Sequence, residues 1–249
     1  MIPLPPLETQ KQITKTLDTA VELLALRKQQ LTELDELIKS IFYDMFGDPD
    51  NNNKSWDINR LGDISEIVSG ITKGRKTKEQ NLISIPYMRV ANVQDGTLNL
   101  TEIKKIDVTT SETAKYQLVN GDLLMTEGGD PDKLGRCAIW SEEIKVCLHQ
   151  NHIFRVRLKK DLIVPQYASF LIGSPYGKKY FLKAAKQTTG IATINSKQLN
   201  NFPVVVPPLY LQTRFAELVD TIEKQKKLIQ KTIDETQYLF DSLMSRCFE

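Results

Sequence analysis

Three glycine-containing stretches carry side chains that suit contacts with a polyanion. The first, "SGITKGRKTK", places four cations around two glycines, at Lys73, Arg75, Lys76 and Lys78. A flexible loop of this kind can bring its positive charges close to the phosphates of DNA. A solvated surface loop has the same composition, so this stretch alone leaves both interpretations open.

The other two stretches mix hydrogen-bond donors with acceptors. "TEGGDPDKLGR" sets Asp130, Lys133 and Arg136 among three glycines, which suits a loop that reads base edges in a groove. "KQTTGIATINSKQ" offers small polar groups for bases and backbone. We expect DNA contacts from its residues Lys186, Gln187, Thr188, Thr189, Asn195, Ser196 and Lys197, and from Arg89 and Asn92 in "PYMRVANV".

One stretch matches the spacing of a metal-dependent nuclease. Pro131-Asp132 is followed, after ten residues, by Glu143-Ile144-Lys145, which satisfies a PD-(D/E)xK pattern. In such sites the carboxylates hold Mg²⁺ and the lysine assists the attacking water. "RCAIW" and "IKVCLH" would then form a hairpin joined at Ser141-Glu142. The pattern is permissive and arises easily by chance, so nuclease activity is kept only as an alternative.

Other catalytic chemistry finds no support in the sequence. Cys147, His149 and His152 are close along the chain, but strand alternation points His152 away from the other two, which argues against a zinc site. The chain lacks a GxxxxGK[ST] loop, a glycine-rich strand-turn-helix signature and an NPPY-like methyltransferase tetrapeptide. We therefore predict no catalytic residue, no metal ligand and no cofactor.

Positive charge is concentrated in the middle of the chain. Residues 51–210 contain 22 Lys+Arg against 15 Asp+Glu, a net charge of +7, whereas the flanks contain 11 against 16, a net of −5. This asymmetry favours a polyanion-binding module held by neutral-to-acidic structural elements, although a chance partition of surface charge would look the same.

The two flanks are copies of one element. Aligning Pro5 with Pro207 at an offset of 202, without a gap, covers 42 positions through Phe46 and Phe248. Eleven of these positions are identical, among them the Pro-Pro-Leu phrase and the glutamine that follows it at residues 10 and 212. Such self-similarity at a fixed offset indicates a repeated structural unit.

Each copy predicts a long helix that begins just after its two prolines, where the missing N–H is tolerated. Neither copy contains a glycine or proline after that point, and apolar residues recur every seven positions, as in a coiled-coil seam. Two amphipathic helices packed separately on a globular core are the alternative. We expect an antiparallel stalk with an apolar interface formed by Leu17, Leu24, Leu31, Ile38, Val219, Ile233 and Phe240.

The region between the helices predicts a mostly β domain. Short β-rich runs separated by turn residues extend from Trp56 to Val206, with a helical stretch at about 166–186 that breaks near "GSPYG". The predicted strands include "ISEIVSG", "PYMRVANV", "GDLLMT", "RCAIW", "KVCLHQ", "HIFRVRL" and "FPVVVPP". The fold class is therefore α+β, with a helix at 1–49, a DNA-binding domain at 50–206 and a second helix at 207–249.

The arrangement resembles the specificity subunits of type I restriction-modification systems, called HsdS. The junction "FPVVVPPLYLQTRFAELVDTIEKQKKLIQK" joins a closing strand, Pro-Pro-Leu and a nearby glutamine to a long helix, and "IPLPPLETQKQI" repeats it. "GDLLMT" and "TTGIATINSKQLNNFPV" also look like landmarks of the family's target-recognition domains. The resemblance covers essentially the whole chain.

The resemblance implies a non-catalytic subunit that reads double-stranded DNA. The family pairs two recognition domains with two helical regions, joined by methyltransferase subunits and a motor-nuclease subunit; this sequence has one recognition domain. We therefore expect a half-sized or truncated subunit, whose missing domain would precede Met1, and a homodimer formed through the helices. A coiled-coil adaptor that binds no DNA is the competing hypothesis.

The cysteine content and the hydropathy of the sequence suggest a protein of a reducing compartment that is not inserted in a membrane. Three cysteines without CxxC spacing do not suggest a disulfide framework, and we expect buried thiols. No signal segment or long apolar run is evident, which predicts a cytoplasmic protein with no membrane partner.

Overall fold

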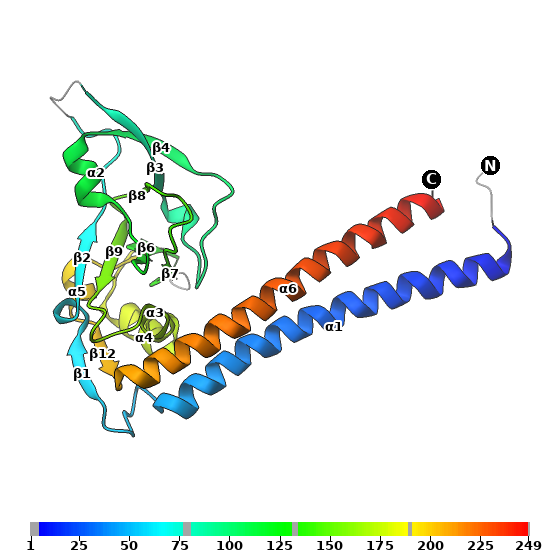
Figure 1. Ribbon diagram of the computed structural model, residues 1–249, viewed down its shortest axis with the longest axis horizontal. Helices are drawn as coiled ribbons and strands as arrows, with labels where there is room; N and C mark the ends of the chain where they lie inside the picture. Colours follow the sequence, from blue (N-terminus) through cyan, green and yellow to red (C-terminus); the bar gives the residue numbers. More distant parts are fainter. Residues whose placement is uncertain (1–4, 77–80, 131–133, 189–190, 249) are drawn as a thin grey trace. The chain divides into compact units, whose positions relative to one another are not determined.

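The computed structural model describes residues 5–76, 81–130, 134–188 and 191–248, without the side chains of 187, 188, 191 and 246–248. The chain divides into two compact units (Figure 1). The helical unit combines Met1–Met45 with Glu217–Glu249, and the central unit is Phe46–Ala216. This division differs from the predicted boundaries near residues 50 and 206, because the first two turns of the C-terminal helix belong to the central unit.

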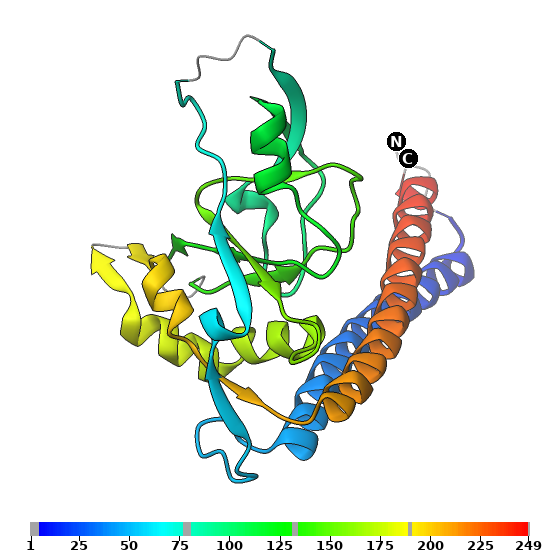
Figure 2. The ribbon, with the colours of Figure 1, turned by 60° about the vertical axis from the view of Figure 1, so that its left-hand side comes forward.

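Two equally long helices, α1 (Leu7–Phe46) and α6 (Leu209–Phe248), each of 40 residues, form the helical unit, apart from Phe46 and the first two turns of α6, which belong to the central unit. They run side by side in opposite directions in both views (Figures 1 and 2). Asp35 of α1 pairs with Lys226 of α6 at 2.7 Å, and Arg27 donates to the Thr232 carbonyl at 2.6 Å. The predicted antiparallel helical pair is confirmed.

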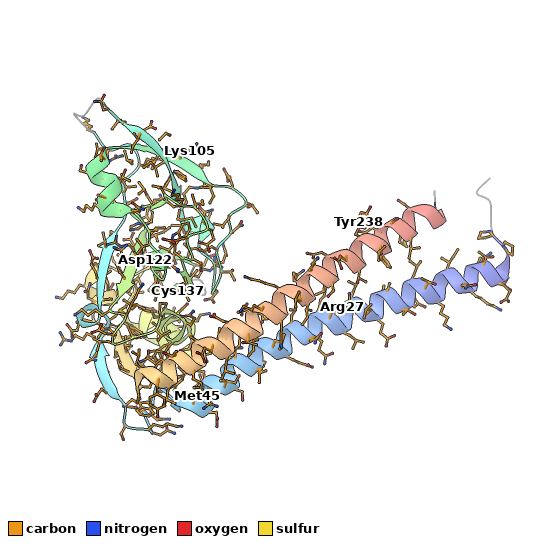
Figure 3. The ribbon with its side chains drawn as sticks, viewed as in Figure 1. Arg27, Met45, Lys105, Asp122, Cys137 and Tyr238 are labelled. Carbon is orange, nitrogen blue, oxygen red and sulfur yellow. The ribbon has the colours of Figure 1, made fainter. Side chains whose placement is uncertain are left out.

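The predicted seven-residue pattern coincides with the shielded faces of both helices. Leu24, Ile38 and Ile233 are each 7% exposed. Leu17, Leu31, Val219 and Phe240 are half-buried on the same faces. Polar residues interrupt the seam: Arg27 also donates to the Thr236 hydroxyl and points toward α6 (Figure 3). Polar groups that pair within the seam help to fix the register of coiled coils.

In the part of the central unit that the structure describes, the strands form four small sheets connected by helices. The sheet orders are β1-β12, β10-β11-β6, β2-β9-β5-β7 and β4-β3-β8. The strands are β1 (Asp57–Arg60), β2 (Ser65–Ser69), β3 (Ile83–Met88), β4 (Lys104–Val108), β5 (Leu123–Thr126), β6 (Gly128–Gly129), β7 (Cys137–Ile139), β8 (Leu148–His149), β9 (Ile153–Leu158), β10 (Lys186–Thr188), β11 (Ile191–Thr193) and β12 (Pro203–Val206). The helices are η1 (Leu61–Asp63), η2 (Val90–Asn92), α2 (Thr110–Tyr116), α3 (Pro165–Gly173), α4 (Pro175–Ala184) and α5 (Ser196–Asn200).

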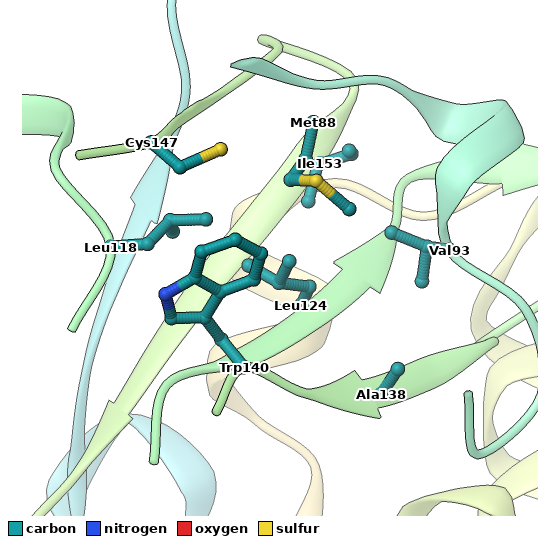
Figure 4. Packing of buried hydrophobic residues seen from close by; sticks show 8 residues of the cluster. All are labelled: Met88, Val93, Leu118, Leu124, Ala138, Trp140, Cys147 and Ile153. Atoms are coloured by element: carbon teal, nitrogen blue, oxygen red, sulfur yellow. The ribbon is translucent and has the colours of Figure 1, made fainter. Parts of the chain in front are cut away.

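A hydrophobic core lies against the four-stranded sheet. All four residues of β5 are buried, as expected for a central strand with both faces covered. Trp140 is fully buried in a cluster that also contains Met88, Val93 and Leu118 (Figure 4). This core fixes the strands from which the candidate DNA-contacting loops extend.

The start of α6 is built into the central unit. Phe215 is fully buried, and its ring lies 5.5 Å from that of Phe46 and 5.6 Å from that of Phe170. Gln212 is also fully buried; its Oε1 accepts from the Val164 N–H at 2.9 Å. The residues that follow the repeated Pro-Pro-Leu phrase therefore pack the first two turns of α6 within the central unit.

The sequence located most elements but misjudged two. The stretch predicted as helical forms α3 and α4, separated at Ser174 because Pro175 begins the second helix. The predicted strand "PYMRVANV" ends at Met88 and turns into the 3₁₀ helix η2, where Asn92 closes a capping box. The hairpin expected between "RCAIW" and "IKVCLH" is wrong, because β7 pairs with β5 and β8 pairs in parallel with β3.

The structure supports the expectation of buried thiols. Cys137 and Cys147 are free and buried, and burial raises the pKa of each thiol to about 12. The side chain of Cys247 lies outside the described residues. Among the described helices, none combines the length and apolar character required to cross a membrane.

Candidate nucleic-acid interface

The first predicted loop is anchored on the turn between β8 and β9, residues 150–152, which we call the root turn. The Ile71 N–H donates to the His149 carbonyl at 2.8 Å, and the Ile71 carbonyl accepts from the Asn151 N–H at 3.0 Å. Gly70 precedes this contact, and a Cβ there would lie 2.0 Å from the His149 oxygen. A glycine is therefore required where the loop leaves β2.

The second predicted loop bonds to the same turn, and the third bonds to the second. The Glu127 N–H donates to the His152 carbonyl at 3.0 Å, and the Glu127 carbonyl accepts from the Ile194 N–H at 2.9 Å. These two loops also share a sheet, since β6 pairs with β11. Gly128 allows the close approach, because a Cβ there would lie 2.7 Å from Thr193 Cγ2. Three stretches distant in sequence are therefore linked by backbone hydrogen bonds.

The cations of the first loop differ in how they are held. Arg75 donates through Nε and a terminal nitrogen to both carboxylate oxygens of Glu112, and also to the Asp107 carbonyl at 3.1 Å. The hydrogen bond from Arg75 lowers the pKa of Glu112 to about 2. Lys73 and Lys76 are exposed. Arg75 therefore fixes the loop to α2, and the two lysines carry the accessible charge.

Lys78 lies outside the described residues. So do Lys133 and Thr189, as well as the side chains of Gln187 and Thr188 on β10. For these five positions the predicted DNA contacts stay predictions.

Arg89 and Asn92 serve the loop that contains them. Asn92 is 3% exposed, and its Nδ2 donates to the carbonyls of Asn99 at 2.8 Å and Glu102 at 3.1 Å. Its Oδ1 accepts from the Arg89 N–H, while the Arg89 guanidinium pairs with Glu102 at 3.1 Å. The amide of Asn92 has no free donor for a base, so we leave Asn92 out of the proposed contacts.

The remaining predicted residues of the second loop lie at the surface. Asp130 is exposed, and Arg136 is half-buried with a hydrogen bond to Gln94 Oε1 at 2.9 Å. Gln94 thus helps to orient Arg136, a candidate contact that the sequence analysis selected. The residues around Gln94 in the sequence gave no sign of this role.

In the third loop, a helix start organises the polar residues. Asn195 caps α5 by accepting from the Gln198 N–H at 2.9 Å, and the Gln198 side chain accepts from the Asn195 N–H at 2.7 Å. Ser196 and Lys197 follow and are exposed, and Lys186 on β10 is exposed as well. This reciprocal capping box holds the Asn195–Lys197 segment in a defined conformation.

A partly buried polar network is centred on strand β9. Arg157 donates to both Asp122 carboxylate oxygens at 2.8 Å, and Arg155 pairs with Glu66 at 3.1 Å. Burial lowers the pKa of His149 to about 4, and both of its ring nitrogens face carbonyl oxygens. Arg155 and Arg157 count toward the positive charge of the domain, but their guanidinium groups pair with carboxylates of the same domain.

The root turn also carries polar side chains that the sequence analysis did not select. His152 Nδ1 lies 2.7 Å from Glu127 Oε2, and Asn151 Nδ2 lies 3.3 Å from His152 Nε2. The polar run "HQNH" between two strands was the available signal, but only the fold brings Glu127 beside it.

The nuclease hypothesis gains nothing from the geometry. Asp132 lies outside the described residues, and Glu143 Oε2 accepts from the Ser141 N–H at 3.1 Å, as a local turn residue does. In the described ranges, no group of three His, Cys, Asp or Glu residues is arranged to hold a metal ion.

Curated relatives share sequence with the whole architecture. The chain is 25% identical to the Type I restriction enzyme EcoKI specificity subunit of Escherichia coli, across 99% of this chain and 56% of that protein. It is 24% identical to the putative type I restriction enzyme MjaX specificity subunit of Methanocaldococcus jannaschii, across 78% of this chain and 46% of the relative. The chain thus spans about half the length of these relatives.

Solved structures share the fold. The HsdS subunit from Thermoanaerobacter tengcongensis superposes with a TM-score of 0.57 at 20% identity, covering 99% of this chain and 60% of that one. A chain from a structure of the type I R-M system gives a TM-score of 0.63 at 19% identity, covering 100% and 61%. The profile described as the type I restriction modification DNA specificity domain matches residues 53–237. The chain therefore belongs to the family of type I restriction-modification specificity proteins.

Proposed function

We propose that this chain is a specificity subunit that recognises a DNA half-site for a type I restriction-modification complex. The central unit contacts double-stranded DNA through the three loops, and exposed lysines bind backbone phosphates. The observation that carries this proposal is that the first two loops bond to the root turn and the third bonds to the second at Glu127, all within the region that matches the family. The subunit supplies recognition and no catalytic group.

The helical unit supplies the docking surface for protein partners. Apolar residues that are identical in the two copies face away from the seam: Leu26 and Leu228 are 56% and 66% exposed, and Leu37 and Leu239 are 45% and 61% exposed. Leucines at such exposure favour a protein partner. We propose that methyltransferase subunits bind there, that a restriction subunit joins through that complex, and that two copies associate through their helices.

A dimer would have consequences for the DNA target. Two-fold symmetry would place two reading units on a palindromic target with a spacer. The helices would set the distance between the half-sites, so deleting one heptad from each helix should change the preferred spacer. An unchanged spacer preference would contradict this ruler role.

DNA binding is tested by titrating the chain against random-sequence duplex at several salt concentrations. Wild-type affinity should fall steeply with salt, and Lys73→Ala/Lys76→Ala should reduce the log–log slope by about 2, since each lost phosphate contact removes about one unit. The charge-matched control Lys15→Ala/Lys28→Ala, on exposed positions of α1, should leave the slope unchanged. Indifference of the wild type to DNA, alone and with a co-expressed methyltransferase subunit, would favour the adaptor hypothesis.

A further inference from the structure

The side chains at the root turn form a directed chain of hydrogen bonds. The carboxylate of Glu127 can only accept, so His152 Nδ1 carries the proton in their 2.7 Å contact. In the neutral ring, Nε2 is then an acceptor, and it faces the Asn151 amide nitrogen at 3.3 Å. The amide of Asn151 therefore selects the tautomer whose N–H orients Glu127.

This arrangement leaves one carboxylate oxygen available. Glu127 Oε1 has no hydrogen-bond partner among the residues that the structure describes, and the side chain is 33% exposed. His152 is more open, at 57%. The site therefore presents a fixed acceptor to solvent, held from behind by a histidine.

The backbone around Glu127 is as constrained as its side chain. Its N–H and carbonyl are both used in the bonds to His152 and Ile194 that join the loops. The following residue, Gly128, packs against Thr193 with no room for a Cβ. A group held in this way keeps a single geometry, which base-edge recognition requires.

The charge of this site indicates its ligand. A carboxylate in a basic domain repels phosphates, so Glu127 weakens binding to backbone alone. Exocyclic amino groups of bases, by contrast, donate to carboxylates; in the major groove, cytosine N4 is the usual partner of Glu, and adenine N6 is a donor as well. An acceptor on the residue that joins the second and third candidate DNA-contacting loops suits a base amine and no other part of a duplex.

We propose that Glu127 is a specificity-determining residue that accepts a hydrogen bond from the exocyclic amino group of a base, and that His152 is its positioning residue. This inference rests on the proposed DNA-recognition function. It adds a residue pair, and the base group that the pair reads, to the predicted set.

The test compares base preferences selected from a randomised duplex library. Wild type should select an amine-bearing base at one position, and Glu127→Gln should relax that preference about tenfold, in line with the loss of one base contact. Affinity for random-sequence duplex should change less than about threefold. Glu142→Gln, on an exposed turn of the same unit, is the matched control and should select the wild-type sequence.

The positioning role is tested by a conservative pair of variants. Asparagine places an amide N–H near the position of histidine Nδ1, so His152→Asn should retain the preference, whereas His152→Ala should relax it at the same base position. A purely structural role would affect both variants alike and would change other positions as well. Fluorescence of the buried Trp140 verifies that each variant is folded.

The possible outcomes distinguish failure of the Glu127 proposal from failure of the proposed DNA-recognition function. If folded Glu127→Gln selects the same sequence as wild type with equal discrimination, the inference is wrong and the function stands. If Glu127→Gln loses affinity for all duplexes alike, Glu127 does not read a base, and the inference is again wrong. If wild type neither selects a sequence nor shows salt-dependent binding, alone and with methyltransferase subunits, both the proposed function and the inference are wrong.

Discussion

The two copies of the Pro-Pro-Leu phrase start their helices in the same way and end in different surroundings. In both, the glutamine side chain donates to the carbonyl five residues earlier at 2.7 Å: Gln10 to Pro5 and Gln212 to Pro207. Gln212 in addition donates to the Leu162 carbonyl at 3.1 Å and accepts from Val164. For Gln10, the bond to Pro5 is the single side-chain hydrogen bond within the described ranges.

The phrase therefore encodes a helix start, and the residues around the second copy pack that start within the central unit. Phe215 is fully buried between aromatic rings, whereas its counterpart Ile13 is half-buried on the helical pair. Four predictions test this difference, in order of decreasing effect.

The largest difference in the free energy of unfolding should come from Phe215 and its counterpart Ile13. Phe215→Ala should lower the free energy of unfolding by about 3–5 kcal/mol, because it empties a closed aromatic site. Ile13→Ala should cost about 1 kcal/mol, since a half-buried side chain loses less contact. Urea denaturation followed by fluorescence of Trp56 and Trp140, both in the central unit, measures the first change. Equal losses for both variants would contradict the comparison.

Acid should destabilise the central unit, which holds the start of the C-terminal copy. His149 has a pKa of about 4 when folded, below its ordinary value of 6.5, because burial disfavours its charged form. The unfolded chain therefore takes up a proton first as pH falls. This histidine's contribution is complete above about pH 6.5 and declines by about 3 kcal/mol as pH falls to 4.

Urea denaturation at a series of pH values, with tryptophan fluorescence as the signal, measures this loss. The variant His149→Gln should show a flatter profile between pH 6.5 and 4. A profile with the wild-type slope would assign the acid sensitivity to other groups.

The glutamine pair should differ by a smaller amount. Gln212→Ala leaves the Val164 N–H and the Leu162 carbonyl without their partner in a buried site, which should cost about 1–3 kcal/mol. Gln10→Ala removes one partly exposed bond and should cost less than about 1 kcal/mol. Parallel denaturation curves for the two variants give the difference directly, and an inverted order would refute the assigned roles.

The smallest stability effect should come from residues that the copies share on their outer faces. Leu26→Ser and Leu228→Ser should each change the free energy of unfolding by less than about 0.5 kcal/mol, because these leucines are exposed. Together they should weaken capture of the methyltransferase subunit in co-expression, while the variant Lys73→Ala/Lys76→Ala, on exposed positions of the central unit, captures it normally. Undiminished capture would remove this face from the proposed docking surface.

The predictions that were confirmed are those that depend on local sequence. Helix length and seam followed from local rules, namely the absence of proline and glycine and the seven-residue spacing that places Leu24 and Ile38 on one face. Loop composition identified exposed lysines such as Lys73 and Lys76. It also selected Arg75, whose guanidinium is bound by a carboxylate 37 residues away. Composition indicates which groups a loop carries but not which of them another element binds.

The sequence by itself determined the two long helices, their shared seam, the basic character of the region between them and the family to which they point. These properties depend on residue spacing and charge, which are local. Only the tertiary structure decided that two of the loops bond to one turn while the third bonds to the second loop, and that Glu127 meets His152, 25 residues away along the chain. Such meetings depend on which strands pair, and strand pairing is decided by the packing of the whole core.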